Sequence, residues 1–253
     1  MKVKILQHDI KWASPSDNQQ HLQQLLRQQP KADLYVLAEM FSTGFATEPE
    51  GIAESNCSSL QWMRRMAKEL DAAIAGSVAT EEEGRFYNRL YFVKPDGEVT
   101  WYDKHHLFTY SGEDKRFTQG GKRVVVEFRG VRFMLQVCYD LRFPVFSRNR
   151  GDYDAMIYVA SWPSSRIEAW KALLRARAIE NQSYVIGVNR MGNDPKCEYA
   201  GGSAIIDAYG KTVAYVEDYQ EGDASAEIDM SELEAFRLKF PVLNDADHFT
   251  IEK

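Results

Sequence analysis

The chain has 253 residues, 44% of them hydrophobic and 27% charged, which is typical of a globular protein with a sizeable core. Its net charge of −6 argues against nucleic acid or an anionic membrane surface as the main partner. No apolar run approaches the ~20 residues of a membrane-spanning helix, and the start, MKVKILQHDI, reads as a first strand rather than a signal peptide.

Short β-rich runs alternate with helical stretches along the whole chain. In chain order we predict strand 3–7, helix 17–27, strand 34–37, helix 58–70, strands 72–78, 87–93, 99–102, 124–128, 131–137 and 155–160, helix 166–181, strands 184–189, 203–206, 212–216 and 224–228, and helix 231–238. The turn signal Pro95-Asp96-Gly97 joins two of these strands. Because we find no repeat and no low-complexity linker, the alternation predicts a single α/β domain, 1–253, with helices on the outer faces of its sheets.

The cysteines and histidines show no metal-binding or disulfide pattern. Cys57, Cys138 and Cys197 lie far apart, and no cysteine stands at zinc-ligand spacing from the pair His105-His106. We therefore expect no metal, no cofactor and no disulfide framework. A reducing cytoplasm is the natural setting for three free thiols.

One of these cysteines lies at a notable position. The segment 133–144, FMLQVCYDLRFP, brings Cys138 to the end of an apolar run and then breaks into Tyr-Asp-x-Arg-x-Pro. Cys138 is either a small core residue, as free cysteines often are, or a nucleophile presented where a strand ends. The segment alone favours the first interpretation, because buried thiols are usually inert.

Three predicted strands end at or near a reactive side chain: Glu39, Lys104 and Cys138. Sites in α/β proteins gather where strand ends open into loops, so the three would share a pocket. Glu39 would accept the thiol proton and Lys104 would stabilise an oxyanion, a set suited to acyl transfer through a thioester. Each residue considered alone also has an ordinary structural interpretation: the glutamate would cap a turn, the lysine would be a solvated surface charge and the cysteine would fill the core.

The same residues lie in blocks that resemble a known family. LAEMFSTGF holds Glu39, YDKHHLF holds Lys104 and CYDLRFP holds Cys138, in family order. RARAIENQSYVIGVNRMG and GGSAIIDAYG extend the likeness to about residue 230. The chain resembles the carbon–nitrogen hydrolase (nitrilase) superfamily, and most closely its omega-amidase branch.

The resemblance implies a fold and a set of roles. The fold would be a four-layer α-β-β-α sandwich, with Glu39 as base, Lys104 as the family's lysine and Cys138 as nucleophile. Glu113, in SGEDKRF, matches a second family glutamate that orients the lysine or helps to move protons. The backbone N–H of Tyr139 would complete the oxyanion hole with the lysine.

One position departs from the family pattern. Family members usually carry Pro before the first glutamate, whereas this chain has Ala38. The change removes the φ restraint at one loop residue and keeps the carboxylate, so it puts in question the rigidity of the loop and not the role of Glu39.

Omega-amidases hydrolyse the terminal amide of 2-oxo acids such as 2-oxoglutaramate and 2-oxosuccinamate and release ammonia, so the resemblance implies a carboxylated amide as substrate. Arg142, four residues past Cys138, is the candidate receptor for that carboxylate, and a structural ion pair with Asp140 is the alternative. Trp162, in ASWPSS, either lines the pocket or is a core aromatic. Two other functions stay open: an amidase or carbamoylase of the same superfamily with another acyl group, and a catalytically silent ligand-binding protein.

The resemblance also implies an assembly. Family members associate about a two-fold axis, so we expect at least a homodimer. The C-terminal tail, FPVLNDADHFTIEK (240–253), has too few apolar residues to form a core of its own. We therefore expect this tail to pack on a partner subunit.

Overall fold

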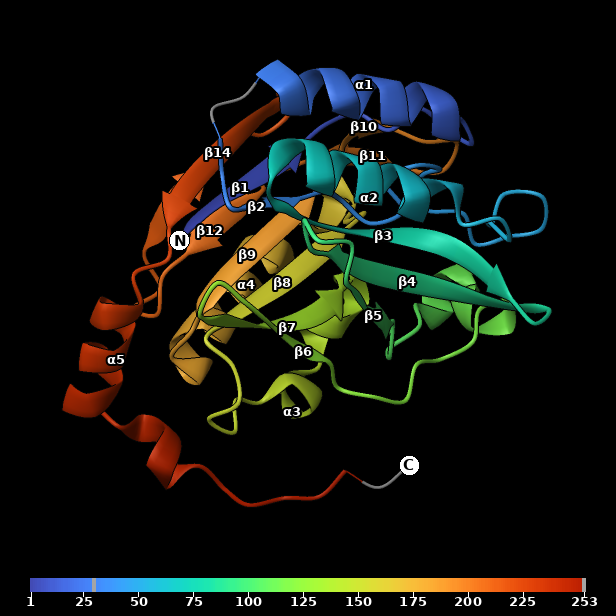
Figure 1. Ribbon diagram of the computed structural model, residues 1–253. Coiled ribbons are helices and arrows are strands. Elements are labelled where there is room, and N and C mark those ends of the chain that lie inside the picture. Colours follow the sequence, from blue (N-terminus) through green and yellow to red (C-terminus); the bar gives the residue numbers. More distant parts are fainter. Residues whose placement is uncertain (29–30, 252–253) are drawn as a thin grey trace.

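The computed structural model describes residues 1–28 and 31–251 of the chain. Its first sheet has the strand order β14-β1-β2-β3-β4-β5 (Figure 1). Strands β1, β2 and β3 run parallel, and the other neighbours pair antiparallel. The bounds are β1 Lys2–Gln7, β2 Leu34–Val36, β3 Ala73–Glu82, β4 Arg85–Val93, β5 Val99–Asp103 and β14 Gly222–Glu227.

The second sheet has the order β13-β12-β9-β8-β7-β6. Its strands are β6 Val125–Phe128, β7 Val131–Val137, β8 Ala155–Ala160, β9 Tyr184–Asn189, β12 Ala204–Ile206 and β13 Thr212–Tyr215. The central strands β7, β8 and β9 are parallel, with Leu135 opposite Ile157 and Ile157 opposite Ile186. Both faces of these strands are covered, which is why their sequences are almost continuously apolar.

Helices cover the outer faces of both sheets. α1 (Pro15–Gln28) and α2 (Ser58–Leu70) pack over the first sheet, and α4 (Ile167–Asn181) packs against β9 and β12 of the second (Figure 1). The predicted four-layer α-β-β-α sandwich is therefore confirmed. Across residues 1–28 and 31–251, no helix is long and apolar enough to cross a membrane.

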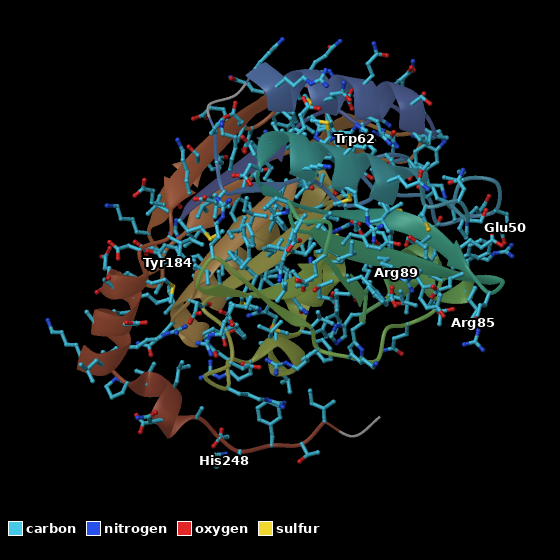
Figure 2. The ribbon with its side chains drawn as sticks, viewed as in Figure 1. Glu50, Trp62, Arg85, Arg89, Tyr184 and His248 are labelled. Carbon is cyan, nitrogen blue, oxygen red and sulfur yellow. The ribbon has the colours of Figure 1, made fainter. Side chains whose placement is uncertain are left out.

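Side-chain alternation along the strands explains the layers. Ile5 of β1 packs in the core between the two sheets, whereas Leu6 packs under the helices, because successive strand residues point to opposite faces. Trp62 of α2 fills that second layer and is 2% exposed. Figure 2 shows Trp62 inside the protein, with Glu50 and His248 at its periphery.

The structure contains short elements that the sequence analysis did not predict. β10 (Met191–Asn193) and β11 (Glu198–Ala200) form a two-stranded hairpin, and α3 (Pro144–Ser147) begins at the proline that ends the Tyr-Asp-x-Arg-x-Pro segment. Each spans only three or four residues, too few for a hydrophobic period to be recognised. The hairpin also contains Gly and Asn, which are depleted in strands.

The C-terminal segment follows α5 (Met230–Lys239) and runs along the protein below α3 in the view of Figure 1. Phe249 lies near the guanidinium of Arg150 of the same chain, with 5.4 Å from Cζ to the ring centroid. Phe240 and Ile251 remain 58% and 38% exposed. Residues 252–253 of the expected tail lie outside the described residues.

Candidate active site

The candidate site lies where strands of both sheets end. Glu39 follows β2 after two residues, Lys104 comes directly after β5, and Cys138 comes directly after β7. Ser161, the first residue after β8, lies beside Glu39, since its backbone N–H donates to Glu39 Oε2 at 2.7 Å. The fold therefore brings together segments that are far apart in the sequence, as expected where strand ends meet.

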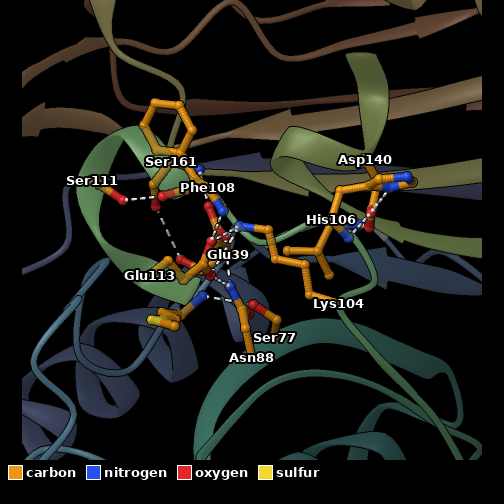
Figure 3. A network of polar contacts seen from close by, with 12 residues as sticks. Glu39, Ser77, Asn88, Lys104, His106, Phe108, Ser111, Glu113, Asp140 and Ser161 are labelled. Carbon is orange, nitrogen blue, oxygen red and sulfur yellow. Dashed lines mark hydrogen bonds and ion pairs between the residues drawn. The ribbon is translucent and has the colours of Figure 1, made fainter. Parts of the chain in front are cut away.

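Lys104 lies between two carboxylates in the interior (Figure 3). Its Nζ is 3.2 Å from Glu39 Oε1, and 3.0 and 2.8 Å from Glu113 Oε1 and Oε2. The side chains of Glu39 and Glu113 are 0% exposed and that of Lys104 is 1% exposed. A buried cluster of two carboxylates and one ammonium results, and the Lys104–Glu113 pair is its closest contact.

The electrostatics of this cluster keep the lysine charged. Burial opposes the ammonium form, but the charges of Glu113 and Glu39 outweigh burial and raise the pKa of Lys104. The pKa of Glu113 is also raised, first by burial and then by the charge of Glu39, while Lys104 opposes the rise. Lys104 is therefore a permanent cation at neutral pH.

Backbone and amide donors fix the two carboxylates. Asn88, inside β4, donates through Nδ2 to Glu39 Oε1 at 2.7 Å and to Glu113 Oε1 at 3.3 Å. The Phe108 N–H donates to Glu113 Oε2 at 2.6 Å. Sequence reasoning missed Asn88, although an amide in the middle of the apolar strand RFYNRLYFV was a usable signal.

The loop that carries Glu39 is tied to the neighbouring strand β3. The Met40 N–H donates to Ser77 Oγ at 2.9 Å, and the Phe41 N–H donates to the Ser77 carbonyl at 3.2 Å. Ala38, which stands where the family usually has Pro, is 0% exposed. Hydrogen bonds to β3 thus restrain this loop in the absence of the proline ring.

Cys138 opens a 3₁₀ turn, Cys138–Arg142, with a left-handed φ of +44°. This conformation costs a residue with a Cβ about 1–2 kcal/mol, so surrounding contacts must maintain it. The buried Asp140 carboxylate accepts the Val137 N–H at 2.9 Å, the Tyr102 hydroxyl at 2.8 Å and the His106 N–H at 2.9 Å. Asp140 thereby ties the Cys138 turn to the segment that carries Lys104.

The Cys138 thiol is not activated in the resting site. Its pKa is raised well above the ordinary value, first by burial and then by the charge of Glu39, while Lys104 and the Ser161 N–H act in the opposite direction. The thiol is therefore protonated at neutral pH, and a nucleophilic attack by this sulfur would require a neighbouring proton acceptor.

A cavity of about 390 Å³ opens in front of these groups, and both Lys104 and Cys138 line it. Tyr139, Arg142 and Trp162 also line it, so the three predicted substrate-binding residues share one pocket with the predicted nucleophile. Sequence reasoning missed several further lining residues, among them Phe45, Phe108, Arg166, Asp194, Lys196 and Tyr199. The last three belong to or adjoin the unpredicted hairpin.

Arg142 lies in the pocket wall without an acidic partner. Its Cζ is 4.8 Å from the ring centroid of Trp162, a cation–π arrangement. Within residues 1–28 and 31–251 no carboxylate lies in ion-pair range of Arg142, and the Asp140 oxygens bond to other donors. The alternative of a structural Arg142–Asp140 pair is not observed.

The two remaining cysteines differ in their relation to the cavity. Cys57 precedes α2 and is outside the lining, whereas Cys197 lines the cavity, and both are free. In the part of the chain that the structure describes, no group of three or more His, Cys, Asp or Glu side chains is placed to hold a metal ion.

Comparison with known proteins agrees with this geometry. A family model described as Carbon-nitrogen hydrolase matches residues 2–238. Omega-amidase YafV of Escherichia coli (strain K12) is 43% identical over 252 residues, covering 99% of this chain and 98% of the relative. The 2-oxoglutaramate amidase of Bacillus subtilis (strain 168) is 36% identical over 250 residues, covering 96% of each.

Solved structures agree as well. A CN-hydrolase superfamily protein from Xanthomonas campestris, with an arsenic adduct in its active site, has a TM-score of 0.96 at 40% identity, covering 100% of this chain and 99% of that one. Nit3 of Saccharomyces cerevisiae, from branch 10 of the nitrilase superfamily, has a TM-score of 0.86 at 25% identity, covering 96% and 94%. As its three sequence blocks predicted, the chain belongs to the carbon–nitrogen hydrolase (nitrilase) family, in the branch of the omega-amidases.

Proposed function

We propose that this protein is an amidohydrolase that cleaves the terminal amide of 2-oxo dicarboxylic acid monoamides, such as 2-oxoglutaramate and 2-oxosuccinamate. The products are the 2-oxo acid and ammonia. The names of the relatives above support this substrate class. The observation that carries the proposal is a cavity lined by Cys138 and by an arginine without an acidic partner, with Glu39 and Lys104 in contact behind it.

In the first half of the reaction, Glu39 accepts the Cys138 proton as the sulfur attacks the amide carbon. The raised pKa of the thiol explains why proton removal must accompany attack. Lys104 and the Tyr139 N–H stabilise the oxyanion of the tetrahedral intermediate. Glu39 then gives the proton to the leaving nitrogen, ammonia departs, and an acyl thioester remains on Cys138.

In the second half, Glu39 accepts a proton from a water molecule that attacks the thioester carbon. The C–S bond breaks, the 2-oxo acid leaves, and the sulfur recovers a proton from Glu39. Glu113 acts as a positioning residue, because its bidentate contact holds the Lys104 ammonium at 2.8 and 3.0 Å. No cofactor enters either half.

Arg142 receives the substrate carboxylate, and the Trp162 ring packs against the Arg142 guanidinium. A guanidinium presents two parallel N–H donors to a carboxylate. The Trp162 ring restrains this fork at 4.8 Å without neutralising it, so less side-chain freedom is lost when the substrate binds.

The competing functions are separated by one assay of ammonia release. The substrates are 2-oxoglutaramate, 2-oxosuccinamate, propionamide and an N-carbamoyl amino acid, each tested on the wild type and on Cys138→Ser. We expect the highest kcat/KM on the 2-oxo amides and nearly no turnover by Cys138→Ser, with Cys57→Ser as the matched control that stays active. A preference for propionamide or for the carbamoyl compound would indicate another hydrolase of the superfamily, and no turnover at all would indicate a ligand-binding protein.

Residues 1–253 act as one domain within a cytoplasmic homodimer, and the tail 240–253 packs on the partner subunit. The exposed Phe240 and Ile251 support the packing of the tail, since an apolar side chain at 58% or 38% exposure gains from being covered. The ligand is a small amide rather than nucleic acid or a membrane, as the net charge of −6 suggests. A sedimentation mass equal to one chain at micromolar concentration would contradict the dimer.

A further inference from the structure

A second arginine lines the pocket besides Arg142. Arg166 lies just before α4, and its Cζ is 5.5 Å from the ring centroid of Phe108. In the described ranges 1–28 and 31–251 its side chain has no carboxylate in ion-pair range and no hydrogen bond. An arginine without a partner beside a cavity leaves its charge available to whatever enters.

Both arginines contact the side chain of Trp162. The Arg142 guanidinium lies over the Trp162 ring, and Trp162 Nε1 donates to the Arg166 carbonyl at 2.8 Å. The structural contact of Arg166 is thus made by its backbone, which any residue would supply. The Arg166 side chain is therefore free for a role in the pocket.

The charges around the cavity are unevenly distributed. Lys104 is balanced by its contacts with Glu39 and Glu113, whereas Arg142 and Arg166 have no carboxylate in ion-pair range among the described residues, and Lys196 adds a further cation to the lining. Asp194 is the acidic residue of the lining, and its carboxylate accepts the backbone N–H groups of Lys196 and Cys197 and the Tyr199 hydroxyl at 2.5–2.7 Å. Apart from Lys104 and its two carboxylates, the lining therefore carries more positive than negative charge.

This distribution discriminates between groups at the 2-position of the substrate. With the amide at Cys138 and the carboxylate on Arg142, the 2-carbon lies one bond from the carboxylate, inside the cavity that Arg166 also lines. A 2-oxo group is neutral and accepts hydrogen bonds from a guanidinium. A 2-ammonium group is repelled there, because like charges placed together across a binding site are strongly disfavoured.

We propose that Arg166 is a specificity-determining residue that excludes 2-amino acid amides such as glutamine and so reserves the site for 2-oxo acid amides. This inference rests on the proposed function, since it takes the amide and carboxylate positions from it. It explains how an amide-cleaving enzyme would not hydrolyse glutamine, an abundant amide that has the same chain length and the same carboxylate as 2-oxoglutaramate.

The test uses three amides that differ only at the 2-position: 2-oxoglutaramate, glutaramate and glutamine. The kcat/KM of glutaramate divided by that of glutamine isolates repulsion of the ammonium, because neither compound has the oxo group. We expect this ratio to fall about tenfold or more in Arg166→Gln, as for removal of a unit charge a few ångströms away, and to stay within about threefold of wild type in Arg166→Lys, which keeps the charge.

The matched control is Arg175→Gln, on the exposed face of the same helix and outside the cavity lining, with the wild-type ratio expected. An unchanged ratio in Arg166→Gln, a glutamine rate that stays undetectable, or equal falls in the Gln and Lys variants would overturn the inference. In each of these cases the proposed function would still hold if the wild type hydrolyses 2-oxoglutaramate. If the wild type does not hydrolyse 2-oxoglutaramate, the proposed function itself is wrong.

Discussion

Lys104 and Glu113 form a bidentate contact in the interior, with Nζ 3.0 and 2.8 Å from the two carboxylate oxygens. The same ammonium is 3.2 Å from Glu39, so Glu113 holds the shorter contacts. Glu113 thus draws the lysine away from a full ion pair with Glu39. This competition keeps Glu39 available as a proton acceptor in the proposed mechanism.

Glu113→Gln should lower kcat about 100-fold, the smaller of the effects expected when a general base, here Glu39, is impaired. The KM should be nearly unchanged. Without the second carboxylate the ammonium contacts Glu39 alone and competes with the thiol proton for its oxygen. The same change removes the Glu113 charge, the larger of the two carboxylate charges that raise the pKa of Lys104, so the pKa of Lys104 should fall. Steady-state kinetics with a pH profile would measure both effects.

Asp114→Asn is the matched control, since Asp114 neighbours Glu113 in the chain but lies outside the cavity lining. A Glu113→Gln enzyme with wild-type kcat and an unshifted pH profile would contradict the positioning role.

Glu39→Gln should slow turnover and speed alkylation of Cys138. Burial and the Glu39 charge both raise the pKa of the thiol, so removing that charge lowers the pKa and increases the thiolate fraction at pH 8. In the wild type the alkylation rate should still be rising above pH 9. Mass spectrometry of the Cys138 peptide measures the rate of iodoacetamide addition as a function of pH and shows whether the pKa of the thiol falls in the variant.

Slower alkylation of Glu39→Gln than of wild type at every pH would mean that Glu39 assists the thiol even without a substrate. Cys197, which lines the same cavity, provides the internal reference, because its rate should not respond to the Glu39 change.

Arg142→Ala should reduce kcat/KM on 2-oxoglutaramate by roughly 30-fold to several-thousand-fold, the result of losing about 2–5 kcal/mol from a desolvated charge pair. Turnover of a neutral amide should change far less, since it has no carboxylate for Arg142. Arg142→Lys should rescue only part, because a point charge lacks the planar fork. Kinetics on both substrates, with a melting curve, test the assignment.

Equal losses on the carboxylated and neutral amides, together with a lower Tm, would count against a carboxylate receptor. The structure favours the selective outcome, since Arg142 contacts the Trp162 ring and no acidic side chain among the described residues.

His8 should make the protein sensitive to acid. It is fully buried, and burial, followed by the charges of His21 and Arg190, lowers its pKa from 6.5 to about 3. The unfolded chain therefore binds a proton between these pH values that the folded chain does not, so stability falls as the pH falls through this window. From pH 6.5 to 5 the loss is about 2 kcal/mol at ~1.4 kcal/mol per pH unit.

His8→Leu should reduce the loss of stability between pH 6.5 and pH 5, whereas His248→Gln, at the exposed C-terminal segment, should not. Urea unfolding at several pH values measures the free energy of unfolding for each variant. If His8→Leu loses as much stability as the wild type between pH 6.5 and pH 5, the acid sensitivity belongs to other groups.

Much of the fold could be read from the sequence because burial leaves a local signature. The predicted strands 131–137, 155–160 and 184–189 match β7, β8 and β9, since strands buried on both faces are apolar throughout. The predicted helix 58–70 matches α2 because its apolar residues recur at helical spacing. The hairpin β10–β11 has no such signature, and with it the Asp194–Lys196 wall of the cavity was missed.

By itself, the sequence determined most of the strand and helix segments, the family and the candidate site residues that lie in its blocks. Only the tertiary structure decided how these residues meet. The Ser161 N–H reaches Glu39 across 122 positions, and Asn88 contacts Glu39 across 49, through the pairing and packing of the two sheets. Arg142 and Arg166 are likewise distinguished from the other described arginines by their place beside the cavity and their lack of a carboxylate in ion-pair range. Such contacts depend on strand register and sheet packing, which are set by the sum of many weak apolar contacts and carry no local sequence pattern.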